Sequence, residues 1–207
     1  RRVELRYEEY PILLVNAFLS AEDKTFFTHG GIDFPGLAGA IFDYASKIGS
    51  GERARGGSTI TQQVAKNLLL GNEYSVTRKV KEAILARRIE SVLTKPQILE
   101  LYLNQIPLGR NSFGVQAAAR AYFNKDVADL ALHEMAFLAI LPKAPETYGR
   151  KRNEGRALAR RDYVLREMLD NGFITQGQYQ TARAAPLGIL PRAATAPNLN
   201  MGGYFLE

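Results

Sequence analysis

The sequence predicts a mainly α-helical domain. Apolar residues recur at helical intervals through most of the chain, whereas period-two alternation is confined to Arg2–Tyr7, where a short strand is expected. The 207 residues are 46% hydrophobic and 23% charged, which is ordinary globular composition with enough length for one sizeable core. No internal repeat is visible, so we expect one domain over residues 1–190, followed by a Pro- and Ala-rich linker over residues 191–207.

The net charge of the chain favours a negatively charged binding partner but does not identify which one. The chain has 27 Lys+Arg against 21 Asp+Glu, a net charge of +6, which favours a nucleic acid, anionic lipid or diphosphate. Cysteine is absent, which excludes disulfides and thiolate nucleophiles, and two histidines do not suggest a His-rich metal centre. The uncharged runs are shorter than the roughly 18 residues of a membrane span. An anchoring segment can precede Arg1, because the sequence does not begin with methionine.

A first helix is predicted from Pro11 to Thr28 and carries a candidate catalytic carboxylate. Phe18, Glu22 and Phe26 follow one another at four-residue spacing, which would stack Glu22 between two aromatic rings. Such desolvation raises the pKa of a carboxyl group, as a general acid or base near neutral pH requires. Gly30-Gly31 would then end the helix. The alternative is that Glu22 is a solvated residue at the edge of an amphipathic helix.

Further helices are predicted along the rest of the chain. Gly and charged residues mark Ser46–Gly57 as a loop, and Gly172 is a helix stop. The apolar face of the helix over Phe34–Tyr44 can be either core or exposed surface. The predicted helices cover Phe34–Tyr44, Ser58–Asn67, Ser75–Leu93, Lys95–Asn104, Val115–Phe123, Leu130–Leu141 and Arg156–Met168.

The helix that begins near Ser58 starts with a polar cluster. Thr59 and Gln62 fit a capping box, so they can serve only to satisfy the first backbone N–H groups. Glycines before a helix N-terminus also favour anion binding. Gln62 and Gln63 precede Lys66 by four and three residues, which places amides and an ammonium on one side, a surface suited to phosphate.

The helix over Ser75–Leu93 is expected to bury its apolar side and to expose a charged cluster. Arg78, Lys79 and Glu82 share one face, so that one carboxylate would orient two cations. A surface salt bridge of a few tenths of a kcal/mol is the alternative interpretation. The side chains expected on the buried side are Val76, Val80, Ala83 and Ile84.

Five motifs in order resemble those of the peptidoglycan glycosyltransferases, glycosyltransferase family 51. They are Glu22-Asp23-x-x-Phe26-x-x-His29-x-Gly31, Gly56 to Gln63, Arg78-Lys79-x-x-Glu82, Lys95-x-x-Ile98-Leu99-x-x-Tyr102-Leu103-Asn104, and Glu134 to Pro145. One departure is that family members often have Asn-Pro near Tyr148, whereas this chain has the basic run Arg150–Arg152.

The resemblance implies a lysozyme-like helical fold with a large and a small lobe. It implies polymerisation of lipid II through β-1,4 bonds, with inversion and release of undecaprenyl diphosphate. The alternatives are a lysozyme-like lytic transglycosylase or hydrolase, which would not need the cation cluster, and a basic nucleic-acid-binding module. We expect no nucleic acid partner, because the aromatic residues lie mainly on apolar helical faces.

The resemblance also implies roles for single residues. Glu22 is the general base, and Glu82 orients Arg78 and Lys79, which with Lys66 meet the charge on the departing diphosphate. Asp23, Phe26 and His29 shape the site around Glu22. Thr59, Gln62, Gln63 and Asn104 are assigned to substrate binding. No dedicated metal site is expected, although Mg²⁺ or Mn²⁺ bridging the diphosphate is compatible with the family.

The resemblance finally places the domain in the cell. The C-terminal tail is similar to the join to the transpeptidase of class A penicillin-binding proteins. Phe34–Tyr44 is expected to rest on the bilayer, assisted by an N-terminal anchor upstream of Arg1. The expected location is the periplasmic face of the bacterial cytoplasmic membrane.

Overall fold

A computed structural model describes residues 4–47, 56–69, 71 and 75–192. The described residues form helices and no strand, apart from one isolated bridge between Pro107 and Phe113. The α-helices are α1 Ile12–Glu22, α2 Phe34–Ser46, α3 Ile60–Leu68, α4 Val76–Val92, α5 Lys95–Gln105, α6 Val115–Phe123, α7 Leu132–Ile140, α8 Pro145–Tyr148, α9 Glu154–Asp170 and α10 Gln176–Ala184. Short 3₁₀ turns cover Tyr7–Glu9, Val127–Asp129, Leu141–Lys143 and Lys151–Asn153.

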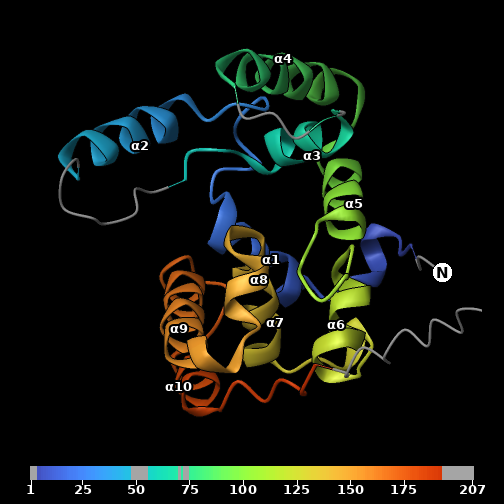
Figure 1. Ribbon diagram of the computed structural model, residues 1–207, viewed down its shortest axis with the longest axis vertical. Helices are drawn as coiled ribbons and strands as arrows, with labels where there is room; N and C mark the ends of the chain where they lie inside the picture. The colour runs from blue at the N-terminus through green and yellow to red at the C-terminus, as the bar shows by residue number, and fades with distance from the viewer. Residues whose placement is uncertain (1–3, 48–55, 70, 72–74, 193–207) are drawn as a thin grey trace, which may run out of the picture.

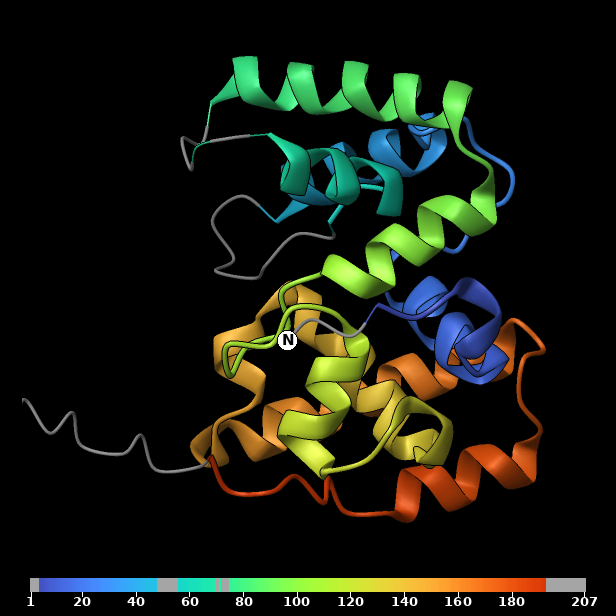
Figure 2. The same cartoon turned by 90° about the vertical axis from the view of Figure 1, so that its right-hand side faces the viewer.

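The helices are arranged in two lobes, as Figures 1 and 2 show. The large lobe contains α1 and α6 to α10, and the small lobe contains α2, α3 and α4. Helix α5 runs between the lobes and contacts α3, α4 and α6. The mainly helical, two-lobed fold predicted from the sequence is therefore confirmed.

The core of the large lobe forms where α7 packs against α1 and α9. Its buried side chains include Phe18 of α1, Phe137 and Leu138 of α7, and Val164 and Leu165 of α9. Apolar residues at helical spacing make these contacts, and their removal from water stabilises the lobe. The nearly all-apolar character of α7 follows from its central place, because a helix surrounded by others needs no polar face.

The first helix ends earlier than its sequence pattern predicts. The structure ends α1 at Glu22, and Asp23 caps it with an extended backbone (φ −159°, ψ 81°). Phe26 therefore lies in the following turns, where it is fully buried, and not on one helix with Phe18 and Glu22 as the spacing predicts. The Asp23 carboxylate accepts hydrogen bonds from residues outside the helix, which compete with further helical turns and which spacing alone does not reveal.

The predicted strand near the N-terminus is wrong for the described residues. Residues 4–6 have no regular structure, and Tyr7–Glu9 forms a 3₁₀ turn. The backbone of Leu5 pairs with a side chain of α5 instead of a neighbouring strand, since Asn104 Nδ2 donates to the Leu5 carbonyl at 2.8 Å. Alternation appears because one side of this segment packs on α5.

The buried face of α4 is also different from the expected one. Val76, Val80 and Ile84 are 83%, 52% and 51% exposed, whereas Glu82, Ala86 and Ile89 are buried. Ala83 is partly exposed. The inner face is set by a close approach to Gly31 (φ +99°), where a Cβ atom would lie 3.0 Å from the Ala86 carbonyl oxygen. The contact between α4 and Gly31, where both residues are small, therefore decides which face of α4 is buried, and the spacing of the apolar residues does not.

Two further predictions fall partly on residues without a described structure. Residues 193–207 of the predicted linker lie outside the described residues, as do residues 48–55 of the predicted loop over Ser46–Gly57. In the described ranges, no helix is both long enough and apolar enough to cross a bilayer.

Candidate active site

Glu22 lies at the C-terminal end of α1, where the two lobes meet. Its Oε2 accepts a hydrogen bond of 3.1 Å from Nε2 of Gln63, which belongs to α3 of the small lobe. Burial raises the pKa of Glu22 to about 7, and the charge of Asp23 adds to this rise. Glu22 can therefore exchange a proton near neutral pH, as a general base or acid must.

Two cations that the sequence analysis does not single out act on Glu22. The positive charges of Arg160 and Lys143, like the hydrogen bond from Gln63, lower the pKa of Glu22 and partly oppose burial. Arg160 belongs to α9 and stacks on Tyr163 at 4.6 Å, and Lys143 follows α7 in a 3₁₀ turn. Lys143 falls within the fifth motif, which is the one signal that could have identified it.

Asp23 joins the end of α1 to the start of α3. Its buried Oδ2 accepts from the backbone N–H of Ile60 at 3.0 Å and from Nε2 of His29 at 2.8 Å. Nδ1 of His29 accepts from the Gly31 N–H at 3.0 Å, so the proton of the neutral ring is on Nε2. A carboxylate at the N-terminus of α3 also complements the helix dipole. Asp23 and His29 thus fix the junction of the lobes.

Phe26 packs beneath this junction and is fully buried. The His29 ring stands edge-on to the Phe26 ring at 5.9 Å, and Lys95 Nζ lies 4.4 Å from the Phe26 centroid. Lys95 also donates to the His29 carbonyl at 2.6 Å and to Glu90 at 2.8 Å. The lysine that begins the fourth motif therefore supports the turns after Glu22.

The capping box predicted at Thr59 and Gln62 is confirmed. Thr59 Oγ1 accepts from the Gln62 N–H at 3.0 Å, and Gln62 Oε1 accepts from the Thr59 N–H at 2.8 Å. Thr59 Oγ1 also donates to the Gly31 carbonyl at 2.7 Å. These two residues build the start of α3, while the neighbouring Gln63 is the one that reaches Glu22.

The charged cluster of α4 has the arrangement predicted from its spacing. Buried Glu82 accepts from Lys79 Nζ at 3.0 Å, and its Oε1 lies 3.6 Å from Nε of Arg78. Lys79 also donates to Ser58 at 2.8 Å, and Arg78 donates to the carbonyl of Lys66 at 3.4 Å. The cluster is thereby attached to both ends of α3, and Lys66 itself is exposed on that helix.

Asn104 is the predicted site residue that the structure does not bring into this group. Its Oδ1 accepts from the Leu5 N–H at 3.0 Å and from the Tyr10 hydroxyl at 2.5 Å, and its Nδ2 donates to the Leu5 carbonyl. These bonds attach the N-terminal segment to α5. The amide has a structural role that its motif position does not reveal.

The family model described as Transglycosylase matches residues 1–169. That range contains every residue of the cluster around Glu22 and of the cation cluster of α4. The chain belongs to the transglycosylase family. The transglycosylase match also extends over Lys143 and Arg160, the two cations found from the structure.

Relatives of this transglycosylase chain are bacterial penicillin-binding proteins. Penicillin-binding protein 1A of Rickettsia felis is 48% identical over 193 residues, which are 93% of this chain and 24% of that protein. Penicillin-binding protein 1A of Escherichia coli K12 is 48% identical over 184 residues, 88% of this chain and 21% of that protein. The crystal structure of penicillin-binding protein 1A from Haemophilus influenzae has a TM-score of 0.55 at 28% identity and covers 95% of this chain and 19% of that one. The chain thus spans about a quarter or less of the length of these relatives.

Proposed function

We propose that this domain is a peptidoglycan glycosyltransferase that polymerises lipid II into β-1,4 glycan strands. The observation that carries the proposal is the position of Glu22, whose pKa is raised to about 7 and whose carboxylate is held by Gln63. The cation cluster on α4 is attached to the same helix as Gln63. A proton acceptor and a diphosphate-binding surface are the two elements that this reaction requires.

Glu22 acts as the general base. It takes the proton from the 4-hydroxyl of the acceptor lipid II while that oxygen bonds to the anomeric carbon of the growing chain. The bond from this carbon to the diphosphate breaks, and undecaprenyl diphosphate leaves with the electron pair. Attack from the opposite side inverts the anomeric carbon. A raised pKa makes Glu22 a stronger base than an exposed glutamate and still leaves it largely ionised slightly above neutral pH.

The cations stabilise the leaving group. Negative charge grows on the diphosphate as the bond breaks, and Lys66, Arg78 and Lys79 provide fixed positive charge for it. Glu82 is a positioning residue, because its buried carboxylate contacts both Arg78 and Lys79 and restricts their rotamers. Asp23 and His29 hold the junction to which Glu22 belongs.

A divalent cation can assist if the substrate supplies its ligands. Among the described residues, no group of three or more His, Asp or Glu side chains could hold a metal ion. The diphosphate oxygens of the substrate would suit Mg²⁺ or Mn²⁺, because these hard cations prefer oxygen ligands. Its contribution would be additional neutralisation of the departing charge.

Membrane attachment is proposed through the small lobe. Phe34, Ile41 and Phe42 of α2 are 62%, 62% and 78% exposed, and Leu37 is 39% exposed. These residues are not core, and the exposed apolar row of α4 lies in the same lobe. We propose that both helices contact the outer face of the bacterial cytoplasmic membrane, where lipid II presents its diphosphate, and that a full-length protein also has an N-terminal anchor and a transpeptidase domain.

A lysozyme-like hydrolase or lytic transglycosylase would use a single glutamate differently. It would cleave finished glycan and would have no use for the cations of α4. The test incubates the protein separately with lipid II and with purified peptidoglycan. We expect glycan polymer and undecaprenyl diphosphate from lipid II, and no soluble fragments from peptidoglycan. Soluble fragments without polymer would instead establish the cleaving activity.

A further inference from the structure

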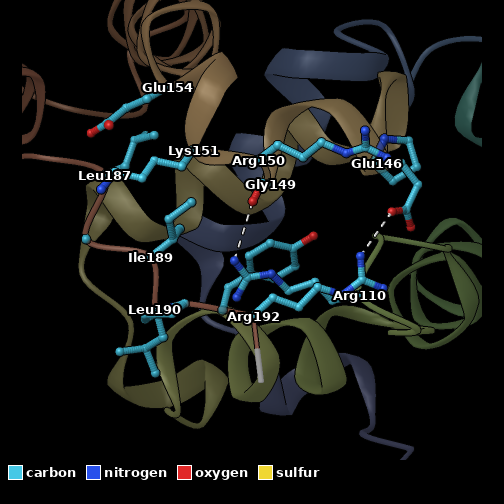
Figure 3. Close-up of a pocket in the computed structure, with 14 residues that line it drawn as sticks. Arg110, Glu146, Gly149, Arg150, Lys151, Glu154, Leu187, Ile189, Leu190 and Arg192 are labelled. Carbon is cyan, nitrogen blue, oxygen red and sulfur yellow. Dashed lines mark hydrogen bonds and ion pairs between the residues drawn. The ribbon is translucent and has the colours of Figure 1, made fainter. Parts of the chain in front are cut away.

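A cavity of about 590 Å³ opens on the large lobe, apart from the cluster around Glu22. Its walls come from α6, from α8 and the 3₁₀ turn after it, and from the irregular segment Leu187–Arg192 (Figure 3). None of the residues assigned to glycosyl transfer lines it. The cavity is therefore separate from the residues to which glycosyl transfer is assigned.

The walls of the cavity are fixed by buried contacts. The backbone N–H of Leu190 donates to the Tyr122 carbonyl at 2.8 Å, and the Tyr122 hydroxyl donates to the Leu108 carbonyl at 2.8 Å. A Cβ atom on Gly149 would lie 3.0 Å from the Tyr122 ring, so α8 approaches α6 closely. Fully buried Arg161 donates to the Pro186 carbonyl at 3.2 Å and holds the start of the irregular segment. The cavity is preformed.

Cations outnumber carboxylates in the lining. Arg110, Arg150, Lys151 and Arg192 face Glu146 and Glu154 around the cavity. The only described ion pair among them joins Arg192 to Glu146 at 3.9 Å, and both side chains are largely exposed. Within the described ranges, Arg110, Arg150 and Lys151 have no carboxylate within ion-pair distance.

Arg110 is the most constrained of these cations. It has a left-handed backbone (φ 49°), its guanidinium lies 4.4 Å over the Tyr122 ring, and it donates to the carbonyls of Ala121 and Gly149. Burial lowers the pKa of Arg110, and the nearby charge of Arg192 acts in the same direction. An anion in the cavity would relieve this uncompensated positive charge.

The rest of the lining is apolar, which limits the kind of anion. Leu187, Ile189, Leu190 and Pro191 form one wall. A polyanion such as nucleic acid is disfavoured, because its phosphates would be repelled by the carboxylates of Glu146 and Glu154. A lipid surface is disfavoured because the cavity is concave and belongs to the large lobe, whereas the exposed apolar helices α2 and α4 belong to the other. A ligand with separate carboxylates and apolar side chains fits this surface.

We propose that the cavity binds a short acidic peptide, with its carboxylates at the arginines and its apolar groups on the wall formed by residues 187–191. Such a peptide can come from the peptide branch of peptidoglycan or from a segment of another protein. The binding itself does not depend on glycosyl transfer, although the first source is relevant only if the proposed function is correct.

The test measures fluorescence anisotropy of a fluorescein-labelled hexapeptide of alternating glutamate and leucine. The control peptide has glutamine in place of glutamate. We expect the acidic peptide to bind at least tenfold more tightly at low ionic strength. The double variant Arg150→Ser with Arg192→Ser should weaken its binding about tenfold, since each exposed ion pair contributes a few-fold. Both side chains are exposed, so the fold should persist.

Arg152→Ser is the matched control, because Arg152 is exposed in the 3₁₀ turn that directly follows Arg150 and does not line the cavity. It should bind the acidic peptide as the wild type does. Equal binding of the two peptides, no binding of either, or an unaffected double variant would overturn the proposal. A soluble disaccharide-peptide fragment of peptidoglycan then separates the sources: displacement of the probe indicates the peptide branch, and no displacement indicates a protein segment.

Discussion

At the scale of single residues, the raised pKa of Glu22 makes activity depend on pH. The base must be ionised, so the rate of lipid II polymerisation should rise through about pH 7 and level off above it. Gln63→Leu removes a hydrogen bond that lowers the pKa of Glu22. The midpoint of the curve of polymerisation rate against pH should therefore move to higher pH. Asn67→Leu, an exposed control on α3, should leave it in place. A rate that falls with pH, or an unmoved midpoint in Gln63→Leu, would contradict this role.

Glu22 should also make folding stability depend on pH, in a defined direction. Its pKa is about 7 in the folded state, against an ordinary value of 4.5 that applies to the unfolded chain. Between pH 4.5 and about 7 the folded chain therefore binds more protons than the unfolded chain. Its contribution to stability is therefore present at low pH and is lost as pH rises through about 7. The melting temperature of Glu22→Gln, relative to wild type, should be higher at pH 8 than at pH 5. An equal difference at both pH values would count against the burial of Glu22.

Residue types and spacing predict part of this site. Glu22 and the pairing of Glu82 with Arg78 and Lys79 can be predicted from the sequence, because one carboxylate on an apolar helix and charges three and four residues apart are local signals. For Lys143 the only sequence signal is its place in the fifth motif, and for Arg160 there is none. The approach of both cations to Glu22 depends on how α7 and α9 pack against α1, which no local pattern specifies.

At the scale of single helices, Glu82 determines where the cations of α4 lie. Glu82→Gln keeps the shape but removes the charge that holds Arg78 and Lys79. We expect turnover to fall by at least tenfold with little change in melting temperature, because weaker diphosphate stabilisation affects the transition state. Glu8→Gln, at an exposed position of the N-terminal 3₁₀ turn, is the control. Full activity with lowered stability would show that the cluster is only a salt bridge.

The inner face of α4 should tolerate no added volume at Ala86. Ala86 is fully buried and its carbonyl lies close to Gly31, so Ala86→Leu should destabilise the domain by about 1–3 kcal/mol through overpacking. Ala83→Leu, at a partly exposed position of the same helix, should change the free energy of unfolding by less than about 0.5 kcal/mol. Urea denaturation of both variants measures this difference. Equal effects would show that the crossing is not tight.

Helix positions can be predicted here, but helix faces and ends are harder. The N-caps at Thr59 and Ser75 and the stop at Gly172 are local signals, and the structure has all of them. The end of α1 depends on bonds from Asp23 to Ile60 and His29, which lie outside that helix. The exposed apolar side chains of α4, Val76, Val80 and Ile84, resemble a buried row in sequence, because helical spacing does not show whether an apolar face packs inward.

At the scale of the whole molecule, the exposed apolar side chains of the small lobe should direct the domain to membranes. Replacing Phe34, Leu37 and Phe42 together with Ser should weaken binding to vesicles that contain anionic lipid, at an unchanged melting temperature, because these side chains are already in solvent. Replacing the three exposed residues Ile12, Phe173 and Leu190 of the large lobe with Ser is the matched control. Unchanged vesicle binding by the first variant would defeat the proposal.

The two-lobed arrangement could be predicted from the resemblance but not from periodicity alone. Helical spacing identifies amphipathic segments, whereas their grouping into lobes depends on long-range bonds such as those from Asp23 to α3. The same bonds place a carboxylate of one lobe beside an amide of the other. The surroundings of Glu22, the proposed base, thus depend on the fold of both lobes.

The most direct test of the account is the rate of lipid II polymerisation by Glu22→Gln, measured with its melting temperature and circular dichroism spectrum. Glutamine preserves the shape of the side chain but cannot take the acceptor proton, and a general base usually contributes about 10²- to 10⁴-fold. We predict a loss of this size in a protein that remains folded. Near-normal glycan synthesis by a folded Glu22→Gln protein would contradict the assignment of Glu22 as the catalytic base.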